Sequence, residues 1–322
     1  MKLAAGLILI CALAWAAQTP ALPNLPQVLW HWPGSADRDD WVCGPGGCGR
    51  APVPPFHFLR EDLSQSTPKL EAHDGRGRTW DVKFGSKVIP ECFASRFLTA
   101  VGYFVEDTYY VASGNLLDVG KLERTRHFVG QDGSFKKARF ELRGQPDLVF
   151  LKDSAWSWND NPFRGTHELA GLKILMMLFS NWDAKDARDG QSDSNTAVFR
   201  IPSARGPELA FSTYDWGSSL GSWGGPWHND RSDCVGYTSD TRRFVERVDN
   251  GEVVFGYSGK HSADLKRGIT VADVQWLLTW LKPITDEQIR TGLRASGATD
   301  RQTGCWAGAI ENRIEQLEAA AH

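Results

Sequence analysis

The chain has 322 residues, of which 41% are hydrophobic and 23% charged, a composition that suits one large domain or two lobes with a sizeable core. Its formal net charge is -3. A charge so close to balance excludes a global electrostatic attraction to nucleic acid, so we expect no nucleic-acid partner. The function has to be sought in individual sites.

The N-terminal residues, MKLAAGLILICALAWAAQTP, have the pattern of a secretory signal peptide. Lys2 precedes an apolar stretch that is shorter than the roughly 18 residues of a membrane span, and small residues follow it. We therefore expect residues 1–17 to be removed and the mature protein to be exported, either periplasmic or secreted, with no stable membrane span. Because the large residue Ile10 precedes Cys11, a lipoprotein is not expected.

Of the six cysteines, Cys11 lies in the signal peptide, which leaves an odd number in the mature chain. Cys43 and Cys48 flank the flexible turn GPGG and are candidates for a disulfide in an oxidising compartment. Structural zinc is the alternative, but no second pair of cysteines or histidines lies at a zinc spacing.

Residues 18–54 are interpreted as a proline-rich leader or linker, because their prolines interrupt any regular element. From residue 55 to about 152 the pattern predicts a small antiparallel sheet with one helix. The helix is predicted over residues 89–103, with Pro90 at the first helical position and Gly102 at the end. The strands are predicted at residues 55–59, 69–73, 79–85, 107–113 and 138–143.

Residues 153–322 are predicted to be mostly helical, which gives the chain an α+β class. Residues 166–181 are apolar on nearly every face, as is typical of a helix buried in a core. Two strands, TAVFRI and LAFSTYDWG, are predicted to follow that helix. Three further helices each begin after a threonine that suits the N-cap position, and they are predicted over residues 270–281, 285–295 and 299–320.

An acidic cluster, NWDAKDARD, follows the buried helix. Asp183 follows the apolar helix and Asp215 follows an apolar strand. The two aspartates lie beside one another if the two strands pair. Two such carboxylates suit metal-assisted phosphoryl transfer, in which one orients the attacking group and the other holds magnesium. Lys185 would then stabilise the transferred phosphoryl group. The alternative is a charged helix terminus followed by a turn aspartate.

The order of these parts resembles the protein-kinase-like superfamily over roughly residues 55–225. Within it the closer likeness is to HipA-type and phosphoinositide-type kinases, because SQSTPK resembles the HipA phosphate loop. WDVKFG resembles the strand with the nucleotide-binding lysine, NWDAKDAR resembles the catalytic loop, and YDWG resembles the Asp-Phe-Gly element. The resemblance makes Lys83 the nucleotide-binding lysine, Asp183 the catalytic aspartate with Lys185 as its companion, and Asp215 the metal ligand.

The resemblance implies a two-lobed protein-kinase-like fold, with a small antiparallel-sheet N-lobe carrying one helix over 55–152 and a mostly helical C-lobe over 153–322. It implies ATP with Mg²⁺ or Mn²⁺ in the cleft between the lobes. Ser66 and Thr67 would contact the phosphates. Lys69 either touches phosphate or ends a turn, and Glu91 either pairs with the strand lysine or complements the helix dipole.

One departure from the family affects the metal. The position five residues after the catalytic aspartate, where the family has a second metal-binding asparagine, is Arg188. Arginine cannot bind magnesium, so Asp186, Asp189 or Asn195 would have to substitute, or the site holds one metal or none.

The acceptor hydroxyl belongs to a protein, lipid, sugar or small molecule, and the sequence does not distinguish these. Because ATP is scarce outside the cytoplasm, a pseudokinase-like binding module with little or no catalysis is the alternative. A third hypothesis is a glycan hydrolase that uses Asp183 and Asp215 as a carboxylate pair. It requires the carboxyl groups to be about 5–9 Å apart with no lysine between them.

Overall fold

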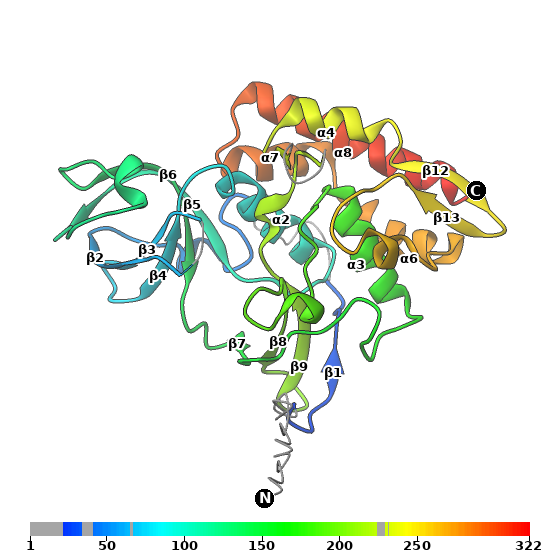
Figure 1. Ribbon diagram of the computed structural model, residues 1–322, viewed down its shortest axis with the longest axis horizontal. Coiled ribbons are helices and arrows are strands. Elements are labelled where there is room, and N and C mark those ends of the chain that lie inside the picture. Colours follow the sequence, from blue (N-terminus) through cyan, green and yellow to red (C-terminus); the bar gives the residue numbers. More distant parts are fainter. Residues whose placement is uncertain (1–21, 34–40, 65–66, 224–228, 231) are drawn as a thin grey trace, which may run out of the picture.

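The computed structural model describes residues 22–33, 41–64, 67–223, 229–230 and 232–322. The predicted signal peptide, residues 1–17, and the predicted phosphate-loop residue Ser66 lie outside the described residues. The described chain is a mixed α/β structure, with strands β2 to β6 on one side of Figure 1 and most of the helices on the other. No helix in this part of the chain is long and apolar enough to cross a bilayer.

Five strands close into a small barrel in the order β2, β3, β4, β6, β5. Neighbouring strands are antiparallel, except that β2 pairs in parallel with β5. The interior is apolar and centres on Leu70, Trp80 and Phe140. The antiparallel strands predicted between residues 55 and 85 are confirmed, whereas the parallel closure has no local sequence signal. The strands are β2 (Phe56–Asp62), β3 (Lys69–His73), β4 (Thr79–Lys83), β5 (Thr108–Leu117) and β6 (Ser134–Leu142).

Helix α2 (Val88–Ala100) packs between the barrel and the helical part, and nearly all of its residues are buried. The prediction that Pro90 begins this helix was wrong by two residues, since Lys87 is the N-cap. Proline is tolerated at the third helical position because the first-turn N–H groups have no partner within the helix. The helix ends as predicted before Gly102, whose φ of 90° favours glycine.

A second sheet has the strand order β1, β9, β8, β7. Strands β8 (Thr196–Ile201) and β9 (Glu208–Thr213), both predicted, form an antiparallel pair, and β7 (Val149–Phe150) lies beside β8. Strand β1 (Gln27–Val28) pairs in parallel with β9. It belongs to the segment interpreted as a leader or linker, of which Leu29 and Trp41 are also buried. This segment therefore contributes to the fold.

The last three helices begin where their threonines predict, because Thr270, Thr285 and Thr299 form capping boxes at their N-termini. Those three are α6 (Val271–Leu281), α7 (Asp286–Ala295) and α8 (Asp300–Ala320). The buried helix predicted over residues 166–181 is α3 (His167–Leu178), which Thr166 caps. The remaining elements are α1 (Gly47–Arg50), α4 (Cys234–Thr241), α5 (Ser262–Lys266), and the pairs β10 (Ser222–Trp223) with β11 (Asn229–Asp230) and β12 (Val245–Asp249) with β13 (Glu252–Phe255).

The end of α3 is fixed by a buried arginine from α8. Arg313 Nη1 donates to the carbonyl oxygens of Met177 and Leu178, at 3.0 and 2.8 Å. These carbonyls lie in the last turn of α3 and have no partner within the helix. The loop that follows, which carries the predicted catalytic residues, therefore leaves from a fixed point.

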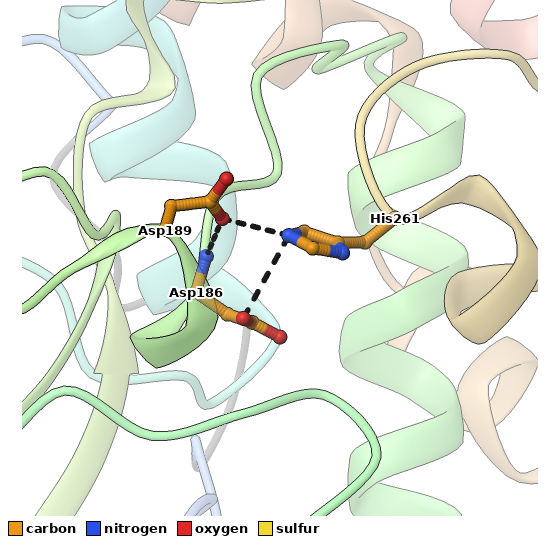
Figure 2. Close-up of side chains that lie close together, drawn as sticks. All are labelled: Asp186, Asp189 and His261. Carbon is orange, nitrogen blue, oxygen red and sulfur yellow. Dashed lines mark hydrogen bonds and ion pairs between the residues drawn. The ribbon is translucent and has the colours of Figure 1, made fainter.

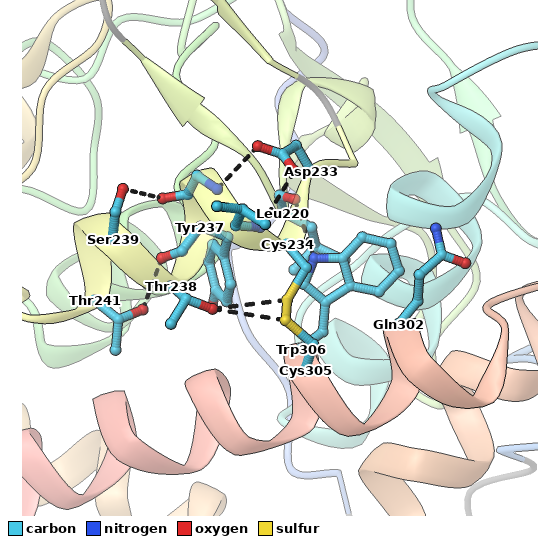
Figure 3. The surroundings of a disulfide bond; sticks show 12 residues. Leu220, Asp233, Cys234, Tyr237, Thr238, Ser239, Thr241, Gln302, Cys305 and Trp306 are labelled. Atoms are coloured by element: carbon cyan, nitrogen blue, oxygen red, sulfur yellow. Dashed lines mark hydrogen bonds between the residues drawn. A yellow bond between two sulfur atoms is a disulfide. The ribbon is translucent and has the colours of Figure 1, made fainter.

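Two disulfides are present among the described cysteines. Cys43–Cys48 closes the small loop suggested by the sequence, and Cys92 is buried and unpaired. The second, Cys234–Cys305, joins α4 to α8, with the Thr238 hydroxyl beside both sulfur atoms (Figure 3). The sequence does not predict this pair, because its members are 71 residues apart.

Candidate active site

Asn181 joins the two segments that carry the predicted catalytic and metal-binding aspartates. Its amide nitrogen donates to the carbonyl oxygen of Asp215 at 3.4 Å, and its amide oxygen accepts from the N–H of Asp183 at 3.3 Å. The Tyr257 hydroxyl donates to the Asn181 carbonyl at 2.5 Å, which holds the residue from the other side. Asp183 and Asp215 are thus brought together through one buried side chain.

Asp183 is buried and stands between two lysines. Lys185 Nζ lies 3.5 Å from Asp183 Oδ2, and Lys260 Nζ lies 3.8 Å from Oδ1. Lys260 follows strand β13, and its N–H donates to the Trp182 carbonyl at 2.9 Å. Each carboxylate oxygen therefore has a lysine ammonium near it, and the two lysines come from segments far apart in the chain.

Asn195 holds the same loop from the strand side. Its amide Nδ2 donates to the carbonyl oxygen of Asp183 at 2.6 Å, and its own N–H donates to the Lys185 carbonyl at 3.1 Å. Within the described residues no donor contacts Asn195 Oδ1, so this oxygen remains available to a cation.

Asp215 follows β9 in the left-handed region, with a φ of 48°, and caps the short 3-10 turn Trp216–Ser218. Lys87 Nζ contacts both carboxylate oxygens, at 2.9 Å from Oδ1 and 2.7 Å from Oδ2. Burial raises the pKa of Asp215, but the charges of Lys83 and Lys87 outweigh it and hold the pKa well below its usual range. The carboxylate is therefore ionised throughout the physiological range.

The predicted nucleotide-binding lysine lies in a buried group of charges on α2 and the barrel. Lys83 Nζ is 3.2 Å from Glu91 Oε1, and Arg139 Nη1 is 2.8 Å from Glu91 Oε2. Lys83 on β4 is paired with Arg139 on β6 in the sheet register, which places both cations opposite the start of α2. Glu91 thus contacts both cations, and Arg139 also pairs with Glu141, at 2.5 Å, so Glu91 has a role beyond complementing a helix dipole.

Gly217 lets the segment after Asp215 lie directly on α2. A Cβ atom at this position would lie 2.5 Å from Lys87 Cδ and 2.6 Å from Glu91 Oε1. A side chain at this position would therefore collide with the side chains of Lys87 and Glu91. This close approach is a physical reason for glycine two residues after the aspartate.

The two other acidic residues of the loop bind neighbouring protein groups. Figure 2 shows Asp186, Asp189 and His261 converging, with His261 Nε2 at 2.7 Å from Asp189 Oδ2 and 3.7 Å from Asp186 Oδ1. Arg188 Nη2 lies 2.6 Å from Asp186 Oδ2 and 2.8 Å from Asp264 Oδ2 on α5. Asp186 is fully buried and also accepts from the Trp158 N–H. These contacts tie the loop to α5.

The predicted phosphate loop lies in the connection between β2 and β3. Lys69 Nζ is 2.9 Å from Asp62 Oδ2, so this lysine pairs across the turn. Thr67 is half-buried, and Ser66 lies outside the described residues.

Sequence reasoning missed Lys87, Asn181, Arg139 and Lys260. Asn181 had a signal, since it and Ser180 are the polar residues that follow the long apolar run over residues 174–179. The other three are brought to the aspartates and Glu91 only by the fold.

No known family profile matches the chain, and no curated protein is significantly similar to it. A search of solved structures finds a similarity to the crystal structure of the Rio2 kinase-ADP/Mg²⁺-phosphoaspartate complex from Chaetomium thermophilum. The two are 14% identical, the alignment covers 82% of this chain and 72% of that chain, and the TM-score is 0.30.

Proposed function

We propose that this protein is an exported, kinase-like phosphotransferase that binds ATP between the β2–β6 barrel and the helical part and acts on a hydroxyl acceptor. The observation that carries the proposal is the shared charge cluster of Lys83, Glu91 and Asp215, with Asp183 held next to it by Asn181. Phosphoryl transfer needs cations on the phosphates and a separate carboxylate for the acceptor. The proposal includes a relationship of this chain to HipA-type or phosphoinositide-type kinases.

In this mechanism Lys83 contacts the phosphates of the nucleotide, and Glu91 orients its ammonium. Asp183 accepts the proton of the acceptor hydroxyl. The acceptor oxygen bonds to the γ-phosphorus, the bond from that phosphorus to the β–γ bridging oxygen breaks, and ADP leaves. Lys185 neutralises charge on the transferred group. The acceptor is a protein, lipid, sugar or small molecule.

Asp215 and Asn195 would hold a divalent cation, Mg²⁺ or Mn²⁺. A carboxylate and an amide oxygen are suitable ligands for such hard cations, and the amide oxygen of Asn195 is uncommitted. When bound, the metal supplies neutralisation of the phosphate charge. Both carboxylate oxygens of Asp186 already accept hydrogen bonds from Arg188, so the acidic residues of the site fit one metal rather than two. Lys87 must release Asp215 before a metal binds there.

The lysine contacts of Asp183 and Asp215 argue against the hydrolase hypothesis but not against the binding-module hypothesis. The carboxylate-pair hydrolase required a site without lysines, and lysines contact both Asp183 and Asp215, which argues against it. The pseudokinase-like binding module remains the second candidate. It is favoured by Lys87 on the proposed metal ligand and by Arg188 in place of a metal-binding asparagine.

Export is supported by the two disulfides, which are typical of oxidising compartments. If residues 1–17 are a signal peptide, mass spectrometry of exported protein should find a mature N-terminus shortly after residue 17. Soluble cytoplasmic protein with an intact N-terminus and reduced cysteines would contradict export.

The function is tested by nucleotide binding and by transfer of labelled phosphate from ATP to protein, lipid and sugar acceptors. Lys83→Met should weaken ATP binding, whereas Asp183→Asn should abolish transfer and leave ATP binding largely intact. Asp193→Asn, an exposed aspartate in the same region, is the matched control and should change neither. A wild-type protein that binds ATP without transferring phosphate would favour the binding module. One that binds no nucleotide would refute both.

A further inference from the structure

Lys87 has no part in the proposed transfer of phosphate. It is the N-cap of α2, its side chain is 9% exposed, and its stem lies over Gly217. The ammonium contacts both oxygens of Asp215, at 2.7 and 2.9 Å. A buried lysine rarely adopts such a position without a charged partner, because desolvation of the ammonium is costly.

The charges around Asp215 are already balanced without a metal. Lys83, Lys87 and Arg139 carry positive charge, and they face the carboxylates of Glu91, Asp215 and Glu141. A divalent cation that approached Asp215 would meet the ammonium of Lys87 at the same two oxygens. The metal and Lys87 therefore cannot both hold this carboxylate.

We propose that Lys87 competes with divalent cations for Asp215 and weakens metal binding at this carboxylate. This inference rests on the proposed nucleotide site and adds which cation Asp215 holds. Because the ammonium already contacts both oxygens of Asp215, a metal must first displace it. Removing the ammonium should convert Asp215 into a tighter metal ligand.

The first measurement uses nucleotide-free protein. Titration with Mn²⁺, followed by electron paramagnetic resonance, should give weak binding for wild type and about tenfold tighter binding for Lys87→Met. Lys152→Met, at an exposed lysine, is the matched control and should bind Mn²⁺ like wild type. Adding Asp215→Asn to Lys87→Met should remove the gain, which would assign it to this carboxylate. Equal Mn²⁺ affinity in wild type and Lys87→Met would overturn the proposal.

The second measurement uses unaltered protein, so it does not depend on a variant that folds. Binding of fluorescent ADP should be the same within about threefold in EDTA and in excess Mn²⁺, because Lys87 keeps Mn²⁺ from Asp215. Loss of more than about tenfold in EDTA would overturn the inference. If no nucleotide binds under either condition, the proposed function fails, while the Mn²⁺ titration still decides whether Lys87 masks Asp215.

Discussion

The side-chain amide of Asn195 donates to the backbone carbonyl of Asp183 at 2.6 Å, although the two residues are twelve positions apart in the chain. Asn195 stands just before β8, and Asp183 lies in the loop after α3. The bond therefore fixes the main chain of the loop against the second sheet. It also leaves the amide oxygen of Asn195 out of this bond.

We expect Asn195→Ala to reduce phosphoryl transfer by roughly ten- to a hundredfold, because a buried carbonyl loses its donor and the loop loses its position. Metal-free nucleotide binding should be unchanged. Steady-state kinetics and fluorescent ADP titration measure the two effects. Ser192→Ala, at an exposed residue of the same connection, should leave both at the wild-type value. An Asn195→Ala protein that transfers phosphate at the wild-type rate would show that the bond is unimportant for activity.

Replacing Glu91 should destabilise the protein itself. Glu91→Ala leaves the buried Lys83 and Arg139 without their shared carboxylate, and such a loss costs roughly 3–5 kcal/mol. Urea unfolding monitored by tryptophan fluorescence measures it. Lys83→Met should cost less, because Glu91 then keeps Arg139 as its partner. The same stability in both variants would mean that the pair with Arg139 contributes nothing.

The disulfides should contribute unequally to stability. Cross-linking residues 71 positions apart restricts the unfolded chain far more than cross-linking residues 5 apart. Replacing Cys234 and Cys305 by serine should cost roughly 4 kcal/mol, against roughly 2 kcal/mol for Cys43 and Cys48. Urea unfolding of the two double variants, with iodoacetamide labelling to confirm the thiol state, makes the comparison. A larger loss from the short loop would contradict the prediction.

Glu106 should make stability depend on pH. Burial, and next the charge of Glu141, raise the pKa of Glu106 to about 8 from its ordinary value of 4.5, against the opposing charges of Arg139 and Lys83. The folded protein therefore keeps a proton that the unfolded chain has lost, so the contribution of Glu106 falls as pH rises from about 4.5 to about 8.

Thermal unfolding of Glu106→Gln and wild type across this range tests the effect. The variant should match wild type in acid, become progressively more stable than wild type up to about pH 8, and keep a constant advantage above it. Glu123→Gln, at an exposed glutamate, is the control and should follow wild type. A pH-independent difference between Glu106→Gln and wild type would refute the raised pKa.

The elements that the sequence predicts well are those with a local cause. The threonine caps of α6, α7 and α8 sit next to the helices that they begin, so a few residues are enough to place each boundary. The strands of the barrel up to β4 are bounded by turn residues. Their parallel closure depends on β5, which is distant in the chain, and no local pattern reports it.

The residues of the candidate site are likewise of two kinds: those found in local sequence motifs and those brought in only by the fold. Lys83, Asp183 and Asp215 stand in short motifs with a recognisable order. Lys87 gains its partner only when Asp215, 128 residues later, is folded against α2, and no spacing in the sequence could indicate that contact. The interpretation of residues 18–54 as a leader had the same limit, because proline content describes local irregularity and says nothing of packing.

Strand β1 has a consequence for the order of folding as the chain is synthesised. Gln27 pairs with Leu209, and Trp30 packs on Trp276 and Trp280, so this N-terminal segment finds its partners only after most of the polypeptide has been made. The β2–β6 barrel is contiguous in sequence and needs none of these later residues. We therefore expect the barrel to fold before the N-terminal segment. Until β9 is available, the tryptophans of that segment stay exposed to solvent, where chaperones can bind them and proteases can cleave the chain.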